Sequence, residues 1–366
     1  MKIPPTLSRY LAKTYFFNML FLLFALLSII YLFDTVELIR RASNHDDVSL
    51  GLVLQMGLLK LPEVGQILFP FAILFSAMFT FWQLTRRSEL IVVRSSGFSV
   101  WQFLSPVILV AVAVGVFQMM AINPVGSILI GKFNQLEGKY LDYENDQIAI
   151  FKEGLWLRQN AEPEASYMIL HAERISQPDW TLSNLSVLFF DEADGLMRRV
   201  DAKSANLEEG RWMFKDVVLH KADFQTIEQD SYSMPTHLTI SDVEESFSSP
   251  ETMSFWQLPG HIQTLEETGF DASRLRVHYH NLLSQPLMFA AMILLAASVS
   301  MRPPRFRGAA TLFGIGIFIG FFVFFMSSFM QALGASQQIP VIMAAWAPAL
   351  ICFLLGLTVM INLEDG

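Results

Sequence analysis

Hydrophobic residues are gathered into six long runs, three near the start of the chain and three near its end. None of the runs contains Asp, Glu, Lys, Arg or His, and the shortest has 19 residues. A helix rises ~1.5 Å per residue, so each run is long enough to cross the ~30 Å apolar core of a bilayer. The pattern predicts membrane-spanning helices over residues 15–33, 64–84, 101–122, 282–301, 309–333 and 340–361.

Between the third and fourth runs the pattern changes to short segments rich in β-branched and aromatic residues. Turn signals such as Asp194-Gly195 separate these segments, as is typical of a β-sandwich or jellyroll. After Pro250 the pattern becomes helical, and Pro259 favours the start and Gly269 the end of a short helix. The predicted strands are 147–151, 155–158, 167–171, 185–190, 197–201, 212–220 and 237–240.

These patterns predict a membrane α-helical protein with six transmembrane helices and an inserted all-β jellyroll domain. We expect four parts along the chain. They are a first transmembrane half (1–130), a β-jellyroll domain (131–250), a helical connector (251–280) and a second transmembrane half (281–366).

Lysine and arginine residues predict which loops face the cytoplasm. Basic clusters precede the first span and fill the loops between spans two and three and between spans four and five. They are Lys2, Arg9 and Lys13; Arg86, Arg87 and Arg94; and Arg302, Arg305 and Arg307. The positive-inside rule makes these three regions cytoplasmic. Both termini are then inside (N-in/C-in) and the inserted domain is outside, and the side of the C-terminus follows from counting helices.

Composition and charge support two physically different parts in one chain. Of the 366 residues, 53% are hydrophobic and 16% are charged, whereas a soluble protein has about 25% charged residues. Residues 131–280 contain 13 basic and 26 acidic residues, a net charge of −13, and the rest contains 12 and 8, a net of +4. The overall charge of −9 argues against a nucleic-acid partner. The single cysteine, Cys352, excludes an intrachain disulfide and a cysteine-rich metal site.

The sequence offers no catalytic or cofactor-binding motif. Residues 126–132 match most of the spacing of a phosphate-binding loop, but Phe133 replaces the hydroxyl residue that holds Mg²⁺. His278 and His280 are two residues apart and point to different faces of a helix, which suits interfacial histidines better than metal ligands. No ionisable residue lies inside a predicted span, so a proton relay is not indicated. We expect no metal, no cofactor, and an energy source on another chain.

Residues 85–99 predict a short cytoplasmic helix between the second and third spans. Ser88 suits the N-cap, Glu89 the positive helix start, and Gly97 the residue after the helix end. One interpretation is a connector on the membrane surface. The other is a coupling helix in a groove of a cytoplasmic motor, with Glu89 contacting an arginine there and the apolar residues as anchors. The candidate coupling residues are Arg87, Ser88, Glu89, Leu90 and Gly97, with Ile91 and Val93 as further apolar residues.

Two further patterns allow a structural and a functional interpretation. Arg40 and Arg41 follow the first span at its outer end, where they can anchor the helix at the interface or bind anionic groups such as phosphates. Gly316 and Gly320 form a small-xxx-small pair in the fifth span. Such a pair lets another helix approach closely, either within the fold or from a partner subunit.

The order of three helices, an outside β domain and three helices resembles the permeases of the bacterial lipopolysaccharide export system, and their G-type subunit more than their F-type. The resemblance covers essentially the whole chain. Its most specific motif is RSELIVVRSSG at residues 87–97, which is similar to the coupling helix of the family. The other matching segments are LSRYLAKT at 7–14, the turn at 191–195 with Ala202, Ala205 and Trp212 downstream, and QPL at 285–287.

The resemblance implies a subunit of an ATP-binding-cassette transporter in the inner membrane of a Gram-negative bacterium, with its β domain in the periplasm. Expected partners are a homologous F-type permease in a heterodimer, a cytoplasmic ATPase dimer, and a single-span protein with its own periplasmic jellyroll. The implied substrate is lipopolysaccharide, which would enter from the outer leaflet into a cavity between helices 1 and 5 of the two permeases. ATP-driven closure of that cavity would then expel it toward the outer membrane.

The resemblance also implies roles for residues outside the coupling helix. Basic residues near the outer end of helix 1 contact substrate phosphates in the family, and Arg40 and Arg41 match such positions. Asp34 stands where a basic residue can occur. Gly316 and Gly320 are expected at the helix packing or lateral gate formed by helix 5.

Two other classes of function were weighed against a lipid-extracting permease. The alternative is a mechanotransmission subunit that relays ATPase motion to its periplasmic domain without moving a lipid. A membrane enzyme acting on lipids is the least favoured, because the spans contain neither acids nor a nucleophile constellation.

Overall fold

The computed structural model describes residues 5–43, 48–141, 148–149, 155–160, 167–176, 181–191, 195–208, 211–221, 226–236, 250–267, 271–301 and 309–365. The chain folds into two compact units. The helical unit comprises Met1–Leu141, Pro250–Pro259 and Ser273–Gly366, and the β unit comprises Asp142–Ser249 and Gly260–Ala272. The predicted fold class, six apolar helices with an inserted all-β domain, is confirmed.

Six helical segments of the described chain are long and apolar enough to cross a membrane, and each overlaps one of the predicted spans. The third segment runs without a break from α4 through a five-residue π-helix, η1, into α5. The helices are α1 (Pro5–Ala42), α2 (Leu50–Arg86), α3 (Glu89–Ser95), α4 (Val100–Phe117), η1 (Gln118–Ile122), α5 (Asn123–Tyr140), η2 (Pro250–Thr252), α7 (Leu258–Glu267), α8 (Ser273–Ser300), α9 (Ala309–Ala335) and α10 (Val341–Asp365).

Most of these helices extend beyond the apolar runs that predict them. The longest, α1, has 38 residues, although its predicted span has only 19. A helix satisfies its backbone hydrogen bonds internally, and Glu, Arg and Leu are good helix formers, so charged residues continue the helix past the apolar stretch. Glu37, Arg40 and Arg41 continue α1 in this way at its C-terminal end.

The predicted start of the β domain at residue 131 is wrong, because α5 continues as a helix to Tyr140. Ile130, Phe133 and Leu136 recur every three residues on this helix and form one apolar face. That face packs into a small core with residues of α1 and α2: Leu38, Ala42, Val53 and Met56. Polar residues lie between these positions, so the segment does not form a continuous hydrophobic run and its helix was not predicted.

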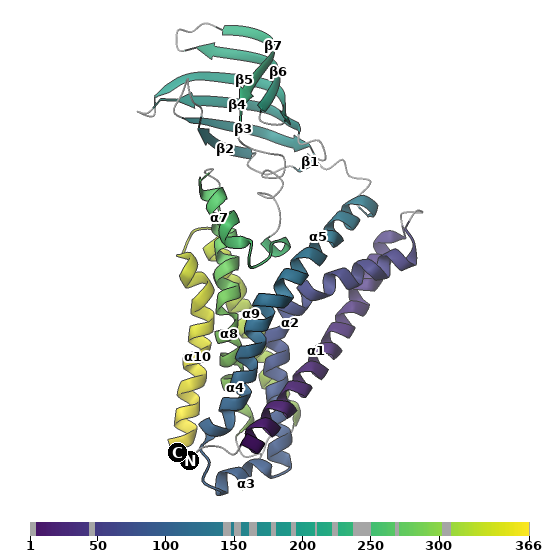
Figure 1. Cartoon of the computed structure of the whole chain (residues 1–366), viewed down its shortest axis with the longest axis vertical. Helices are drawn as coiled ribbons and strands as arrows, with labels where there is room; N and C mark the ends of the chain where they lie inside the picture. Colours follow the sequence, from purple (N-terminus) through teal and green to yellow (C-terminus); the bar gives the residue numbers. More distant parts are fainter. Residues whose placement is uncertain are drawn as a thin grey trace. The chain divides into compact units, whose positions relative to one another are not determined.

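The start of α1, the end of α10 and the short helix α3 lie at the same end of the helical unit (Figure 1). This arrangement agrees with the prediction that both termini and the 85–99 segment share one side of a membrane. The predicted basic residues Lys2, Arg302, Arg305 and Arg307 lie outside the described residues, as does Gly269.

Helices α2 and α8 form the centre of the helical unit. In their most apolar windows 56% and 67% of the residues are buried, against 11% in α1 and 17% in α9. Phe69 of α2 and Phe289 of α8 stack with ring centroids 6.1 Å apart. The apolar helices α1 and α9 are therefore the two spans least covered by the rest of their own chain.

The β unit contains an antiparallel sheet in which β3 to β7 follow one another in chain order, with β1 and β2 both beside β3. Its strands are β1 (Ile148–Ala149), β2 (Leu155–Asn160), β3 (Tyr167–Ser176), β4 (Thr181–Phe190), β5 (Leu196–Glu208), β6 (Arg211–Lys221) and β7 (Thr226–Pro235). Six predicted strands coincide with β1 to β6, and the predicted strand at 237–240 lies outside the described residues. The sequence pattern missed β7, because most side chains of this edge strand are exposed and polar.

Buried positions in the three central strands do not alternate throughout. Each strand has one step of three residues within its two-residue period. The steps run from Leu182 to Leu185 in β4, from Ala202 to Ala205 in β5 and from Phe214 to Val217 in β6. They are aligned across the sheet, since Ala205 pairs with both Leu182 and Phe214. Asn184 and Asp216 accommodate the extra residue with left-handed backbones, at φ 52° and 53°.

Candidate functional site

The short helix α3 is joined to α2 through Ser88. The Ser88 N–H donates to the Thr85 carbonyl at 3.1 Å, and the Val92 N–H donates to the Ser88 carbonyl at 3.2 Å. Ser88 therefore occupies the predicted N-cap position, but its φ of 59° is left-handed, whereas an N-cap residue is typically extended. Gly97 has φ 83° just beyond the helix end, as predicted. Only the two turn residues Arg87 and Ser88 lie between α2 and α3.

Glu89, the first residue of α3, is held by two side chains of its own chain. Tyr10 Oη donates a hydrogen bond to Glu89 Oε2 at 3.0 Å, which joins α3 to α1. Arg87 Nη1 lies 3.9 Å from Glu89 Oε1. The Glu89 side chain is still 36% exposed, so a partner can reach it. Sequence reasoning missed Tyr10 as a contact of Glu89, although the residue belongs to the matching segment at 7–14.

The apolar residues of α3 divide between two roles. Leu90 is only 7% exposed and belongs to the core of the helical unit, and Val93 packs against that core. Val92, by contrast, is 62% exposed. The prediction that Leu90 offers apolar surface to a partner is therefore wrong, because Leu90 fixes α3 to its own unit. Val92 is the exposed apolar residue. The side chain of Ile91 is not among those that the structure describes.

Both arginines at the C-terminal end of α1 form ion pairs. Arg40 Nε and Nη2 donate to the carboxylate of Glu37 at 2.9 and 2.6 Å, one turn earlier on the same helix. Arg41 Nη1 donates to Glu137 Oε1 of α5 at 2.6 Å. The Arg40 side chain is 75% exposed and that of Arg41 37% exposed. An anionic ligand there competes with the chain's own carboxylates.

A third ion pair lies on the same helices. Lys60 Nζ of α2 is 3.6 Å from Asp34 Oδ2 of α1, and it also lies 5.8 Å from the ring centre of Phe133. Asp34 therefore forms an ion pair with Lys60 of its own chain, at the position where the family resemblance allows a basic residue. The three cations and the three carboxylates of these pairs balance in formal charge, which keeps this polar group of α1, α2 and α5 neutral.

The two glycines of α9 face α2 of the same chain. A Cβ atom on Gly316 would collide with the end of the Met78 side chain. A Cβ atom on Gly320 would lie 3.1 Å from Phe71 Cδ1. The structure places both glycines at a helix-packing contact within the fold, and the opposite face of α9 carries large exposed side chains.

Large apolar side chains are exposed on α1, α9 and α10. Those on α1 include Phe17, Phe21, Phe24, Leu32, Phe33 and Val36, those on α9 include Phe318, Phe322, Phe325 and Phe329, and those on α10 include Leu354 and Leu355. Apolar patches larger than a few hundred Å² on a protein surface mark contacts with lipid or with a partner. Together with α10, these helices therefore offer apolar surface that lipid or another protein can cover.

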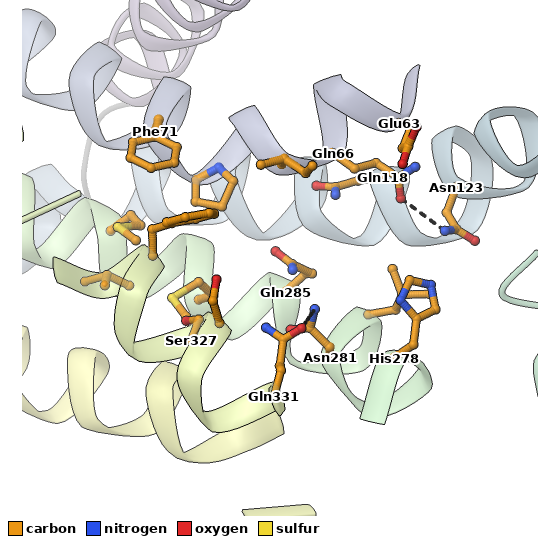
Figure 2. Close-up of a pocket in the computed structure, with 18 of the residues that line it drawn as sticks. Glu63, Gln66, Phe71, Gln118, Asn123, His278, Asn281, Gln285, Ser327 and Gln331 are labelled. Atoms are coloured by element: carbon orange, nitrogen blue, oxygen red, sulfur yellow. Dashed lines mark hydrogen bonds between the residues drawn. The ribbon is translucent and has the colours of Figure 1, made fainter. Parts of the chain in front are cut away.

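A cavity of about 370 Å³ lies among α2, η1, α8 and α9 (Figure 2). Its polar lining includes Glu63, Gln118, His278 and Gln285, none of which was predicted as a site residue. Glu63 comes just before the predicted second span, and Gln118 and Gln285 are amides, so a search for ionisable residues within spans overlooks them. Among the described residues, His, Cys, Asp and Glu side chains form no group of three that could hold a metal ion.

The chain was compared with known proteins. A sequence model of the family described as "Lipopolysaccharide export system permease LptF/LptG" matches residues 9–362. The chain is 25% identical over 369 residues to the lipopolysaccharide export system permease protein LptG of Escherichia coli K12, and the match covers 97% of this chain and 98% of that protein. It is also 25% identical over 353 residues to the protein of the same name from Haemophilus influenzae, covering 94% and 95% of the two chains.

Proposed function

The chain belongs to the lipopolysaccharide export system permease LptF/LptG family, and we propose that it is the G-type permease subunit of an ATP-binding-cassette transporter. In this role it extracts lipopolysaccharide from the outer leaflet of the inner membrane of a Gram-negative bacterium. It pairs with a homologous F-type permease and is driven by a cytoplasmic ATPase dimer. The β unit lies in the periplasm and passes the lipid toward the outer membrane.

The observation that carries the pairing is the low burial of α1 and α9. Only 11% and 17% of their most apolar windows are buried in the chain itself. A second permease that presents the same two helices would form, together with this chain, a cavity with apolar walls. Acyl chains bury well against such walls, at ~25 cal/mol per Å² of apolar surface removed from water. Because lipid extraction from a bilayer is uphill by the same term, the process needs a motor.

The motor acts through α3 in this proposal. Glu89 is exposed, charged and oriented by Tyr10, and Val92 beside it is an exposed apolar residue. An arginine in a groove of the ATPase would pair with the Glu89 carboxylate, and the Val92 side chain would pack against the groove. Since only two residues separate α3 from α2, closure of the ATPase moves α2 and, through Tyr10, α1.

The outer ends of α1 and α5 meet the head group of the lipid in this proposal. Arg40 and Arg41 bind phosphates of lipopolysaccharide with the fork geometry of guanidinium. Their present partners, Glu37 and Glu137, are exchanged for phosphate oxygens, and exposed ion pairs are weak enough for such an exchange.

The β unit offers an edge to a periplasmic partner. Strand β7 is at one end of the described sheet and pairs there with β6. An exposed edge strand can accept a strand from another protein through backbone hydrogen bonds. A single-span protein with its own jellyroll is the proposed partner, and it would extend the path for the lipid.

The coupling role is tested with Glu89→Leu in the assembled complex. We expect ATP-dependent release of lipopolysaccharide from proteoliposomes to be lost, with the subunits still copurifying. Ser95→Ala, an exposed change at the other end of α3, serves as the matched control and should release lipid normally. Unchanged release by Glu89→Leu, in a complex of normal composition, contradicts the coupling role.

A second experiment separates lipid extraction from mechanotransmission. A photo-crosslinking amino acid is placed at Leu32 or Val36, two exposed positions near the outer end of α1. A permease that binds the lipid should give lipopolysaccharide adducts that decrease on ATP addition. A subunit that only relays motion gives none.

A further inference from the structure

The cavity inside the helical unit changes from polar to apolar along its walls (Figure 2). Along α2, the lining begins with Glu63 and Gln66 and ends with Phe71. Along α8, it begins with His278 and ends with Met292. The cavity therefore has a polar end and an apolar end, as a site for an amphiphilic molecule requires.

The residues that line the cavity include atoms that lack hydrogen-bond partners within the described part of the chain. They are Gln118 Oε1, Gln285 Oε1, Ser327 Oγ and His278 Nε2. Gln118 is only 1% exposed, and all four atoms are inaccessible to solvent. A buried polar atom without a partner costs about 1–3 kcal/mol. The residues that carry these four atoms all line one cavity, so small side-chain rotations would present the atoms to a ligand that supplies the missing hydrogen bonds.

The neighbouring polar side chains already satisfy one another in part. Asn123 Nδ2 donates to Gln66 Oε1 at 3.0 Å, and Asn281 Nδ2 donates to Gln331 Oε1 at 3.3 Å. These bonds hold the walls in place around the four unpartnered atoms. Gln118 is the first residue of the π-helix η1, and such π-helical turns are frequent at functional sites.

The charges around the cavity exclude an anionic ligand. Two carboxylates, those of Glu63 and Glu251, line it, and none of the residues that line it is Lys or Arg. Amide oxygens and carboxylates accept hydrogen bonds, so the ligand must donate them. The four unpartnered atoms come from η1, α8 and α9. An ammonium group concentrates its donors on one nitrogen, whereas several hydroxyls can reach all three elements. Hydroxyls also suit Ser327 and His278, which can each donate or accept.

We propose that this cavity binds an amphiphile with a hydroxyl-bearing, sugar-like head group and one alkyl chain. The head group lies between Gln118 and Gln285, and the chain points toward Phe71 and Met292. A volume of about 370 Å³ is at the lower end of the range for small-molecule sites, so the ligand is much smaller than a whole lipopolysaccharide. All of the residues that line the site belong to one copy of the chain.

The test uses the full chain in lipid nanodiscs and three photoreactive probes with the same diazirine-bearing octyl chain. Their head groups are glucoside, amine and phosphate. After illumination, mass spectrometry locates the adducts. We expect the glucoside probe to label the α2 and α8 segments around Phe71 and Met292 about tenfold more than the phosphate probe does, with the amine probe in between. All three probes should label the exposed faces of α1 and α9 alike.

Variants of the polar end give a second readout. Gln118→Leu and Gln285→Leu should each reduce labelling of the cavity by the glucoside probe about tenfold, which corresponds to one lost hydrogen bond to a buried group. Phe322→Leu, on the exposed face of α9, is the matched control and should leave it unchanged. Because the two amide oxygens are unpartnered, both leucine variants should fold with undiminished thermal stability.

Three results overturn the proposal. Equal labelling of the cavity by all three probes shows that the head group is not recognised. Full labelling in both leucine variants shows that the amides do not bind it. Labelling of the outer faces alone, by every probe, shows that the cavity holds only water. The comparison of the probes uses the unmodified chain, so a variant that fails to fold does not affect it.

Discussion

Tyr10 and Glu89 are joined by a hydrogen bond of 3.0 Å from Tyr10 Oη to Glu89 Oε2, although 79 residues separate them in the chain. The bond connects the start of α1 to the start of α3. Because α3 also follows α2 after only two turn residues, a displacement of α3 reaches two long helices at once. One of these, α1, has the least buried membrane window of the unit and is therefore the freest to move.

The first prediction concerns this bond. Tyr10→Phe removes the donor and keeps the ring, so the Glu89 carboxylate loses its orientation toward a partner. A hydrogen bond of this kind contributes about 0.5–1.5 kcal/mol, so we expect ATP-dependent lipid release to fall about two- to tenfold. The control is Tyr31→Phe, farther along α1, which removes a hydroxyl that donates to the Leu54 carbonyl of α2. Lipid release should stay normal in this variant. An equal loss in both variants would show that the effect is not specific to α3.

The second prediction separates the two apolar residues of α3. Leu90→Ala should lower the stability of the helical unit by about 2–5 kcal/mol, because Leu90 is buried in its core. Val92→Ser should change stability by less than about 0.5 kcal/mol, since the residue is exposed. The same change should nevertheless weaken copurification of the ATPase. Thermal unfolding in detergent and quantified copurification measure the two effects, and a strong loss of stability in Val92→Ser would contradict the assignment.

The third prediction concerns the competition for Arg40. Glu37→Gln removes the carboxylate that now occupies this guanidinium, so the affinity for lipopolysaccharide should rise a few-fold at low salt. Arg40→Gln should lower it. Both differences should shrink at about 1 M salt, where the screening length is only ~3 Å. Binding of labelled lipopolysaccharide at two ionic strengths measures this, and a salt-independent change would argue against an electrostatic cause.

The fourth prediction compares two glycines of α9 that lie two residues apart, Gly314 and Gly316. Gly316→Leu places a branched side chain against Met78 and Phe75, and such overpacking costs about 1–3 kcal/mol. Gly314→Leu meets no atom within 4 Å of its Cβ, so stability should not fall, and the higher helix propensity of Leu should raise it by up to about 1 kcal/mol. Thermal unfolding of the two variants in the same detergent decides the matter. Similar melting temperatures would mean that α9 does not pack on α2 through Gly316.

Local signals in the sequence were sufficient for the spans and for α3. The spans follow from runs without charge, and α3 follows from Ser88, Glu89 and Gly97, which mark its two ends. Strand β7 gave no such signal, since Met234 is its only buried residue and most of its other side chains are exposed and polar. The sequence pattern also missed helix α5, because the apolar face of this helix is narrow and interrupted by polar residues.

The polar sites depend on residues that only the fold brings together. Arg41 meets Glu137 across 96 residues, and Lys60 of α2 meets Asp34 of α1. The polar residues that line the cavity come from α2 and η1 in the first half of the chain and from α8 and α9 in the second. Two of them, Gln118 and Gln285, are amides, which a search for ionisable groups does not find. A count of every hydrogen-bonding residue within the apolar runs would have included Gln118 and Gln285, together with other amides such as Gln83 and Gln102.

The aligned three-residue steps in β4, β5 and β6 restrict how this sheet can evolve. Deleting Asn184 alone would turn one half of β4 over, so that Leu182 pointed to solvent while its neighbour Ala205 still faced the core. An insertion or deletion in any one of the three strands is therefore tolerated only when the other two change in the same way. Length differences between homologous β units should consequently be confined to the hairpin turns.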